Sequence, residues 1–448
     1  MRYLSTRGNA PTQAFCDILL GGLAPDGGLY LPESYPQISR DELDFWRHLS
    51  YADLAFEILS KFIDDIPAID LKSIVAKTYT DEVYCHSRNG GNPVQITPLT
   101  RLDDGLYIQE LSNGPTLAFK DMAMQLLGNL FEYVLDKRGE SINILGATSG
   151  DTGSAVANGF LGVEGIHVYV LYPKGLVSPI QECQFTTLGQ NITALEVDGT
   201  FDDCQALVKS AFMDEELNAK MKLTSANSIN VARFLPQAFY YFYAFAQLKA
   251  ISEAAAKNMV VCVPSGNFGN ITAGLFAKRM GLPVKRFIAA NNRNDIFLEY
   301  LKTGEYKPRP SVSTIANAMD VGDPSNFARI LDLYGNSHEA IAAEISGVSY
   351  SDEQIAETLK TCKKETGYLL DPHGACGYRA LKEMLLPGEV GVFLETAHPA
   401  KFLETVEGIL GEKVEIPEKL QEFMKGEKKS EAMTKHFADF KAYLLGRS

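Results

Sequence analysis

From about residue 140 onwards, short apolar segments alternate with glycine-bearing loops and with segments of helical periodicity. Short apolar strands of this kind are typical of parallel sheets that are covered by helices on both faces. The expected strands are Ile142–Leu145, Ile166–Leu171, Ala194–Val197, Val260–Val263, Arg286–Ala290 and Gly391–Leu394. The helices expected to follow strands are Ser154–Phe160, Phe201–Phe212, Ile271–Met280 and Pro399–Ile409. The pattern therefore predicts an α/β fold, in which ligands bind where the carboxyl ends of strands meet helix N-termini.

The beginning of the chain lacks this alternation. Residues 13–20 and 51–62 have apolar residues at helical spacing, which predicts a helical N-terminal domain over residues 1–90. A cluster of glycine, asparagine and proline at 90–93 marks the expected boundary with a second region over residues 91–448.

Two further segments are interpreted as helices. Residues 234–251 are rich in aromatic side chains but contain proline, glutamine and lysine, so a buried helix is expected there rather than a membrane span. Residues 417–445 predict one or two amphipathic helices.

Composition excludes several classes of function. The formal net charge is -14 over 448 residues, and without any Lys/Arg-rich run this argues against nucleic-acid binding. Seven cysteines are scattered without CxxC spacing, so neither a disulfide framework nor a metal site is expected. The first residues have no apolar core of the kind that directs secretion. We therefore expect a cytoplasmic protein that does not bind membranes.

One lysine stands out as a candidate nucleophile. Lys120 follows a turn built from Asn113, Gly114 and Pro115, on the apolar side of an expected helix. Its apolar neighbours in the sequence are Leu117, Phe119, Met122 and Met124. Desolvation by such neighbours lowers the pKa of an amine, which favours attack on a carbonyl and formation of a Schiff base near neutral pH. The alternative is a surface lysine whose stem lies along the helix.

Two glycine-rich loops have the features of anion sites. Residues 146–153 and 265–270 each follow an expected strand and open an expected helix, so backbone N–H groups can approach an anion. The second loop lacks the lysine of nucleotide-triphosphate loops and the spacing of a dinucleotide fingerprint. Each loop alone could be a packing turn. Together with Lys120 they indicate a phosphorylated cofactor and an anionic substrate.

The motifs that carry this chemistry resemble those of the threonine synthase family, in its longer bacterial and fungal form. They are SNGPTLAFKD at 112–121, GATSGDTGSA at 146–155, PSGNFGN at 264–270 and LETAHPAKF at 394–402. Segments 24–32, 225–237 and 317–326 extend the resemblance over nearly the whole chain. It implies a fold type II pyridoxal phosphate (PLP) enzyme of the tryptophan synthase β type. Parallel sheets flanked by helices would form two subdomains, the smaller and mobile one at about 140–230, beside the helical N-terminal domain.

The resemblance also implies roles for individual residues. Lys120 would form the Schiff base with pyridoxal 5'-phosphate, and Thr396 would offer its hydroxyl to the pyridine nitrogen. The residues implied for the cofactor phosphate are Gly266, Asn267, Phe268, Gly269 and Asn270. Those implied for the substrate are Thr148, Ser149, Asp151 and Thr152, whose loop would receive the α-carboxylate. Asp151 stands where many fold type II enzymes have Asn, and Asn270 where some long-form members have Asp.

The implied substrate is O-phospho-L-homoserine, so a second phosphate has to be bound. Its candidate ligands are Lys174, Ser178, Ser228, Asn230 and Arg233, of which Arg233 has the planar fork that suits phosphate. In the implied reaction Lys120 removes the Cα proton, phosphate leaves from Cγ, and water adds at Cβ to give threonine. The nearby His373 and His398 are interpreted as structural residues at helix starts. A monomer or a homodimer is expected.

Three alternatives stay open at this stage. A serine/threonine dehydratase or a cysteate synthase would share the lysine and the loops but not the second phosphate site. A catalytically inert metabolite-binding protein would share only the scaffold, and the intact Lys120 argues against it. A structural protein would have no need of these three motifs together.

Overall fold

Two sheets with mostly parallel strands organise the chain, as the alternating pattern predicts. The computed structural model describes residues 1–84, 95–227 and 230–447. The larger sheet has the order β11 (Ile345–Ser349), β10 (Arg286–Asn291), β9 (Met259–Pro264), β12 (Val390–Glu395), β4 (Leu106–Glu110), β3 (Leu99–Asp103). Only β3 is antiparallel to its neighbour. The smaller sheet has the order β13 (Ser430–Thr434), β7 (Ile192–Asp198), β6 (Ile166–Pro173), β5 (Ile142–Ala147), β8 (Leu223–Thr224), all parallel.

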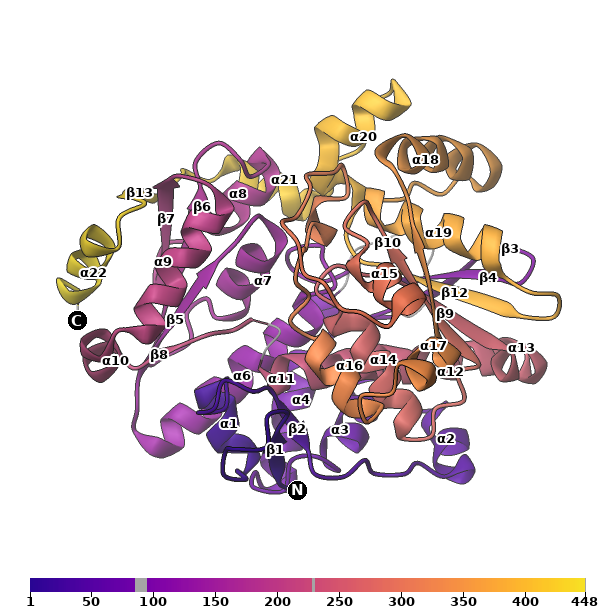
Figure 1. The fold of residues 1–448 in the computed structure, drawn as a ribbon, viewed down its shortest axis with the longest axis horizontal. Helices are drawn as coiled ribbons and strands as arrows, with labels where there is room; N and C mark the ends of the chain where they lie inside the picture. Colours follow the sequence, from indigo (N-terminus) through magenta and orange to yellow (C-terminus); the bar gives the residue numbers. More distant parts are fainter. Residues whose placement is uncertain (85–94, 228–229, 448) are drawn as a thin grey trace.

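Helices cover both sheets (Figure 1). Those of the smaller unit are α7 (Asp151–Gly159), α8 (Pro179–Thr186), α9 (Phe201–Met213), α10 (Glu215–Met221), α21 (Glu418–Lys425) and α22 (Phe437–Leu445). Those of the larger unit are α6 (Asp121–Arg138), α11 (Val231–Phe234), η1 (Leu235–Ala238), α12 (Phe239–Ile251), α13 (Glu253–Lys257), α14 (Gly269–Arg279), α15 (Ile296–Thr303), η2 (Asn317–Met319), α16 (Phe327–Leu333), α17 (His338–Glu344), α18 (Asp352–Thr366), α19 (Pro372–Met384), η3 (Pro399–Phe402) and α20 (Leu403–Leu410). No helix in these described ranges is long and apolar enough to cross a membrane. The aromatic segment is the buried helix α12, as expected.

The N-terminal part is mostly helical, as expected, and also contains a pair of short strands. β1 (Tyr3–Ser5) and β2 (Tyr30–Pro32) pair antiparallel beside α1 (Phe15–Gly21), α2 (Arg40–Trp46), α3 (Tyr51–Leu59), α4 (Ala68–Thr78) and α5 (Asp81–Tyr84). This part packs on α12 and α14 through edge-to-face or tilted ring pairs, among them Trp46 of α2 with Phe242, and Phe62, which follows α3, with Phe276. Figure 1 shows this part, in indigo, against one side of the larger unit. The boundary expected at 90–93 lies outside the described residues.

The segment expected to hold only terminal helices also contributes a strand. Between α21 and α22, β13 pairs with β7 in register Ser430 to Ala194 and Thr434 to Asp198. Figure 1 shows this yellow segment running from the larger unit to the outer edge of the smaller sheet. The flanking helices could be predicted from the helical periodicity of their own residues. The strand β13 could not, because it forms only by pairing with β7, which is far away in the sequence.

Helices α6 and α7 cross at backbone contact, and glycine makes this possible. A Cβ atom built on Gly128 would lie 2.0 Å from the carbonyl oxygen of Gly159, and one on Gly159 would lie 2.7 Å from the carbonyl oxygen of Met124. Either side chain would force the helices apart. This crossing fixes the relative position of the two helix N-termini, where Lys120 and Asp151 are found.

Candidate active site

The loop that carries Lys120 is fixed before α6 begins. The carboxylate of Asp121 accepts hydrogen bonds from the backbone N–H and the hydroxyl of Thr116, at 2.8 and 2.7 Å. The backbone N–H of Phe119 donates to Thr396 O at 2.8 Å, which ties this loop to the segment that follows β12. Lys120 is therefore the residue immediately before the helix, not a residue on its apolar face as the sequence predicted.

The Lys120 amine lies in a buried, charged environment. Its side chain is 12% exposed, and its Nζ lies 3.6 Å from Oδ2 of Asp151 and 5.0 Å from the ring centre of Phe119. Burial lowers the pKa of Lys120, the Asp151 charge opposes this shift, and the cations Arg233 and Lys401 add to it. A lowered pKa leaves more of the amine neutral and nucleophilic near pH 7.

Asp151 is held as an anion at the N-terminus of α7. Burial alone would raise the pKa of Asp151, but the charges of Lys401 and Lys120 and hydrogen bonds from Lys401 and Gln181 hold it well below its usual range. Oδ1 of Asp151 lies 2.7 Å from Nζ of Lys401 and 2.9 Å from Nε2 of Gln181. The sequence placed Asp151 in a substrate loop, and neither of these two partners was foreseen.

The loop at 146–153 is shaped by Thr148. The Oγ1 atom of Thr148 accepts hydrogen bonds from the backbone N–H groups of Gly150 and Gly153, at 3.0 and 2.8 Å. The side chain of Thr148 is thus used within the loop and does not line the cavity, whereas Ser149 and Thr152 do line it. The expectation of a direct substrate contact by the Thr148 hydroxyl is not supported by this geometry.

The loop at 265–270 forms a tight cradle at the N-terminus of α14. A Cβ on Gly266 would lie 2.8 Å from Cα of Met319, so only glycine fits beside that backbone. Phe268 has φ of 60°, a strained conformation for a residue with a side chain, of a kind that concentrates at binding sites. Oδ1 of Asn267 accepts hydrogen bonds from the backbone and the hydroxyl of Ser325, at 2.7 and 3.0 Å.

Asn270 contributes a donor to this cradle. Its Oδ1 accepts hydrogen bonds from the hydroxyls of Tyr240 and Tyr241, at 2.6 and 2.8 Å, which orients the amide. Its Nδ2 is buried and has no hydrogen-bond partner among the described residues. A buried N–H group without an acceptor costs free energy, so an oxygen atom of a bound ligand would stabilise this site by accepting its hydrogen bond. Small residues, a helix N-terminus and this donor fit the phosphate of the expected cofactor.

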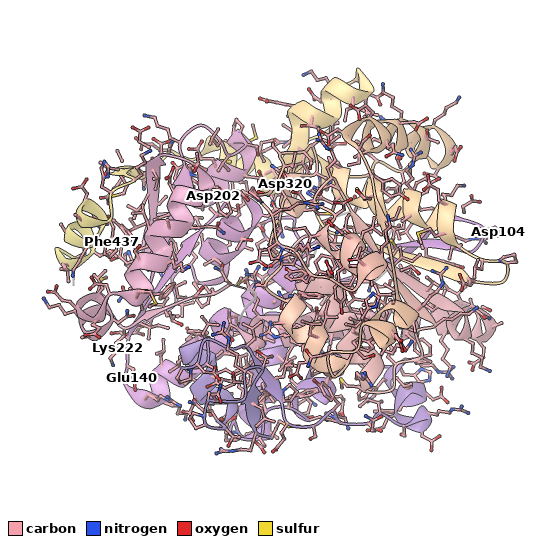
Figure 2. The ribbon with its side chains drawn as sticks, in the orientation of Figure 1. Asp104, Glu140, Asp202, Lys222, Asp320 and Phe437 are labelled. Carbon is pink, nitrogen blue, oxygen red and sulfur yellow. The ribbon has the colours of Figure 1, made fainter. Side chains whose placement is uncertain are left out.

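A single cavity of about 420 Å³ joins these groups. Lys120, Ser149, Asp151, Thr152, Arg233, Gly266, Asn267, Phe268, Gly269, Asn270 and Thr396 all line it. The lining comes from both sheet units: Asp320, which follows η2, belongs to the larger unit, and Phe201 of α9 belongs to the smaller unit. Figure 2 labels Asp320 and Asp202, the residue next to Phe201. The cavity therefore lies between the two sheet units.

The candidates for the second phosphate separate into two groups. Arg233 lines the cavity, where burial lowers its pKa to about 10, and its Nη1 donates to the carbonyl oxygen of Ala226 at 3.0 Å. Lys174 is exposed and lies outside the lining. Ser178 accepts a hydrogen bond from the backbone N–H of Gln181 and caps α8, and Asn230 caps α11 and donates to Leu19 O. Of these side chains only Arg233 is in place to bind substrate. Ser228 lies outside the described residues.

Several lining residues were missed or given another role by the sequence reading. His373 was interpreted as structural, and its Nδ1 does lie 2.6 Å from Oδ1 of Asp371 while its Nε2 accepts the N–H of Ala318 at 3.1 Å. Its ring also lines the cavity and holds the loop that covers Gly266. Gln205, Asn227 and Gln237 line the cavity as well. Asn227 and Gln237 lie in the quoted segment 225–237 but were given no role, and Gln205 lies in none of the quoted motifs.

Comparisons with known proteins agree along the whole chain. Family models match for the threonine synthase N terminus over residues 2–79, for pyridoxal-phosphate dependent enzymes over 89–392, and for the threonine synthase C-terminal part over 374–444. Threonine synthase from Methylobacillus glycogenes is 44% identical, covering 99% of both chains. The PLP-bound threonine synthase from Brucella melitensis superposes with a TM-score of 0.92 at 38% identity, covering 100% of this chain and 99% of that one. The yeast threonine synthase structure gives 0.90 at 35% identity, with coverage of 100% and 99%.

Proposed function

The chain belongs to the threonine synthase family, and we infer from this that it is a PLP-dependent carbon–oxygen lyase that converts O-phospho-L-homoserine and water to L-threonine and phosphate. The observation that carries the proposal is the position of Lys120. Its desolvated amine enters a cavity that also contains two loops suited to anions. The site thus offers one nucleophile and separate places for a cofactor and an anionic substrate.

The cofactor would be held by three groups of this chain. Backbone N–H groups of 266–270 and Nδ2 of Asn270 would bind its phosphate, the hydroxyl of Thr396 would meet the pyridine nitrogen, and Lys120 would provide the attaching amine. When bound, the cofactor supplies an electron sink for negative charge that develops beside the substrate's Cα.

Lys120 is the proposed base and acid of the reaction. Its neutral amine takes the proton from Cα of the substrate, loss of a Cβ proton then allows phosphate to leave from Cγ, and the ammonium of Lys120 returns a proton at Cγ. Water adds its hydroxyl group at Cβ and gives up a proton, and a proton returned to Cα completes threonine. Lys120 directly precedes α6 and its loop is bonded to Thr396, so the main chain that carries the amine is held in place beside the cavity. Its lowered pKa suits both steps at neutral pH.

The two anionic ends of the substrate are assigned to different elements. Ser149, Thr152 and the N-terminus of α7 would receive the α-carboxylate, since hydroxyls meet the positive end of a helix there. Arg233 would bind the substrate phosphate from α11. In a molecule with a net charge of -14, such a local cation is needed to admit a phosphate ester.

The setting of the enzyme is part of the proposal. We place it in the cytoplasm as a monomer or a homodimer, with one domain over residues 1–90 and a catalytic region over 91–448. Closure of the smaller unit, at about 140–230, would exclude water before phosphate has left, because premature hydration or protonation would divert the reaction.

The test uses protein reconstituted with PLP and supplied with O-phospho-L-homoserine, while threonine and phosphate are both measured. Equal formation of the two is expected. Phosphate with 2-oxobutanoate would instead indicate a dehydratase-like ending, and no turnover by a protein that binds the cofactor would refute the substrate. Lys120→Ala should abolish turnover, whereas replacing Lys137, an exposed lysine in the last turn of α6, by alanine should not change it.

A further inference from the structure

A second lysine near the cavity has no part in the reaction described so far. Lys401 of η3 has a fully buried side chain, at 0% exposure. Its Nζ lies 2.7 Å from Oδ1 of Asp151 and donates to the carbonyl oxygen of Thr116, also at 2.7 Å. Burial of an ammonium is costly, so it persists only where partners compensate it well. Lys401 does not line the cavity, and its ammonium is engaged by protein groups.

The two oxygens of Asp151 have different partners. Oδ1 receives both Lys401 and the amide of Gln181, while Oδ2 lies 3.6 Å from Nζ of Lys120. Two contacts on one oxygen fix the rotation of the carboxylate, which leaves the other oxygen directed at Lys120. The arrangement is a row of buried charges in the order cation, anion, cation.

Lys401 also connects the two sheet units. It follows β12 of the larger sheet, whereas Asp151 opens α7 of the smaller unit. The hydroxyl of Ser178, which caps α8 in the smaller unit, donates to the backbone carbonyl of Lys401 at 3.3 Å. Both the main chain and the side chain of Lys401 therefore hold the smaller unit against the segment that contains Thr396.

We propose that Lys401 is a positioning residue that holds the Asp151 carboxylate, as an anion of fixed orientation, against the nitrogen of Lys120. The proposal rests on the proposed function only in taking Lys120 as the lysine that carries the cofactor. The charged groups that act on Lys120 are Asp151 from α7, Arg233 from α11 and Lys401 from η3. Asp151 favours a proton on the Lys120 nitrogen, and the two cations disfavour it. Lys401 therefore moderates the effect of Asp151 while keeping that residue ionised.

The proposal predicts opposite effects for the two partners. In Lys401→Met, the loss of a nearby cation should raise the pH at which the Lys120 nitrogen loses its proton, by on the order of one unit. Asp151→Asn should lower that pH by a similar amount, because the stabilising anion is removed. The double variant removes one charge of each sign, so its midpoint should lie between those of the single variants.

The measurement is a pH titration of the visible absorbance of the holoenzyme without substrate, which reports the proton on the Lys120–cofactor linkage and needs no turnover. Lys249→Met is the control. Lys249 lies in the last turn of α12, is 12% exposed and pairs with Glu253 at 3.6 Å, but it is not among the charged groups that act on Lys120. Its midpoint should equal that of the wild type. A wild-type protein without a cofactor band would refute the proposed function, not the role of Lys401.

Two results would overturn the role of Lys401. One is a midpoint in Lys401→Met equal to that of the control, with only reduced resistance to urea, because this would make the ion pair purely structural. The other covers the case in which Lys401→Met does not fold, since a buried carboxylate left without its partner is strongly destabilising. Asp151→Asn is then compared with the wild type, and equal midpoints in these two would refute the proposal, because the carboxylate that Lys401 holds would then have no effect on the Lys120 nitrogen.

Discussion

Replacing Gly128 by alanine tests whether the crossing of α6 and α7 positions the catalytic groups. The added Cβ would lie 2.0 Å from the carbonyl oxygen of Gly159, whereas close carbon–oxygen contacts in proteins are about 3.3 Å. The helices would therefore have to separate by roughly 1.3 Å at this point. Both colliding groups belong to or adjoin the backbone, so no side-chain rotation can relieve the contact.

The expected cost follows from two opposing effects. Overpacking of a well-packed interior costs about 1–3 kcal/mol. Alanine in a helix interior is favoured over glycine by about 1 kcal/mol. Because a backbone contact cannot relax locally, the overpacking cost should reach the upper end of its range, about 3 kcal/mol. After the gain of about 1 kcal/mol from alanine, we expect Gly128→Ala to reduce the free energy of unfolding by about 2 kcal/mol net. Separation of the helix N-termini should also weaken the Lys120–Asp151 contact and shift the absorbance midpoint described above.

Urea unfolding of the variant and of a matched control provides the assay. Gly408 lies within α20, and a Cβ there would have no heavy atom within 4 Å. Gly408→Ala should therefore increase the free energy of unfolding by about 0.5–1 kcal/mol. If Gly128→Ala were as stable as the wild type, or gained stability as the control does, the argument from the helix crossing would be refuted.

Three further predictions concern single side chains. Asn270→Leu should weaken binding of pyridoxal phosphate at least tenfold in a fluorescence titration, because the buried Nδ2 donor is lost; unchanged affinity would mean that Nδ2 has no ligand oxygen. Arg233→Met should raise KM for O-phospho-L-homoserine at least tenfold while cofactor affinity is kept, and an unchanged KM would remove Arg233 from the substrate site. Hydrogen bonding to Arg286 lowers the pKa of Glu389 to about 2; the pair therefore stabilises the fold fully above pH 4.5, the ordinary value for Glu, and this contribution is lost as the pH falls towards 2. In Glu389→Gln, the free energy of unfolding should therefore fall less steeply as the pH is lowered from 4.5 towards 2. The same steepness as in the wild type would show that the Glu389–Arg286 pair does not contribute to stability.

The sequence predicted the fold well where the information is local. All six expected strands are present, each slightly longer than predicted, because runs of apolar β-branched residues bounded by glycine loops specify buried strands. The two anion loops and Lys120 were located for the same reason, since each is a contiguous motif. The rule that ligands bind at the carboxyl ends of parallel strands applies to each loop separately, because the loop at 146–153 follows β5 of the smaller sheet and the loop at 265–270 follows β9 of the larger sheet.

What the sequence did not predict depends on partners distant in the chain. Lys401 was part of a quoted motif, yet its role arises from Thr116, 285 residues away, and from Asp151. Asn230 and Ser178 are polar residues in segments that the sequence marked as candidate phosphate ligands. In the structure their side chains instead cap the N-termini of α11 and α8. Capping and ligand binding use the same residue types, so composition cannot distinguish them.

The strand β13 has a consequence for how the chain is made. Its pairing with β7 joins segments separated by more than two hundred residues, as the ion pair of Lys428 with Glu196, 232 residues apart, illustrates. Until residues 430–434 leave the ribosome, β7 is an edge strand with unpaired N–H and C=O groups. The smaller sheet can therefore be completed only late in synthesis. Nascent chains that stall before that point would expose a template for aggregation, which makes this edge a natural place for chaperone protection.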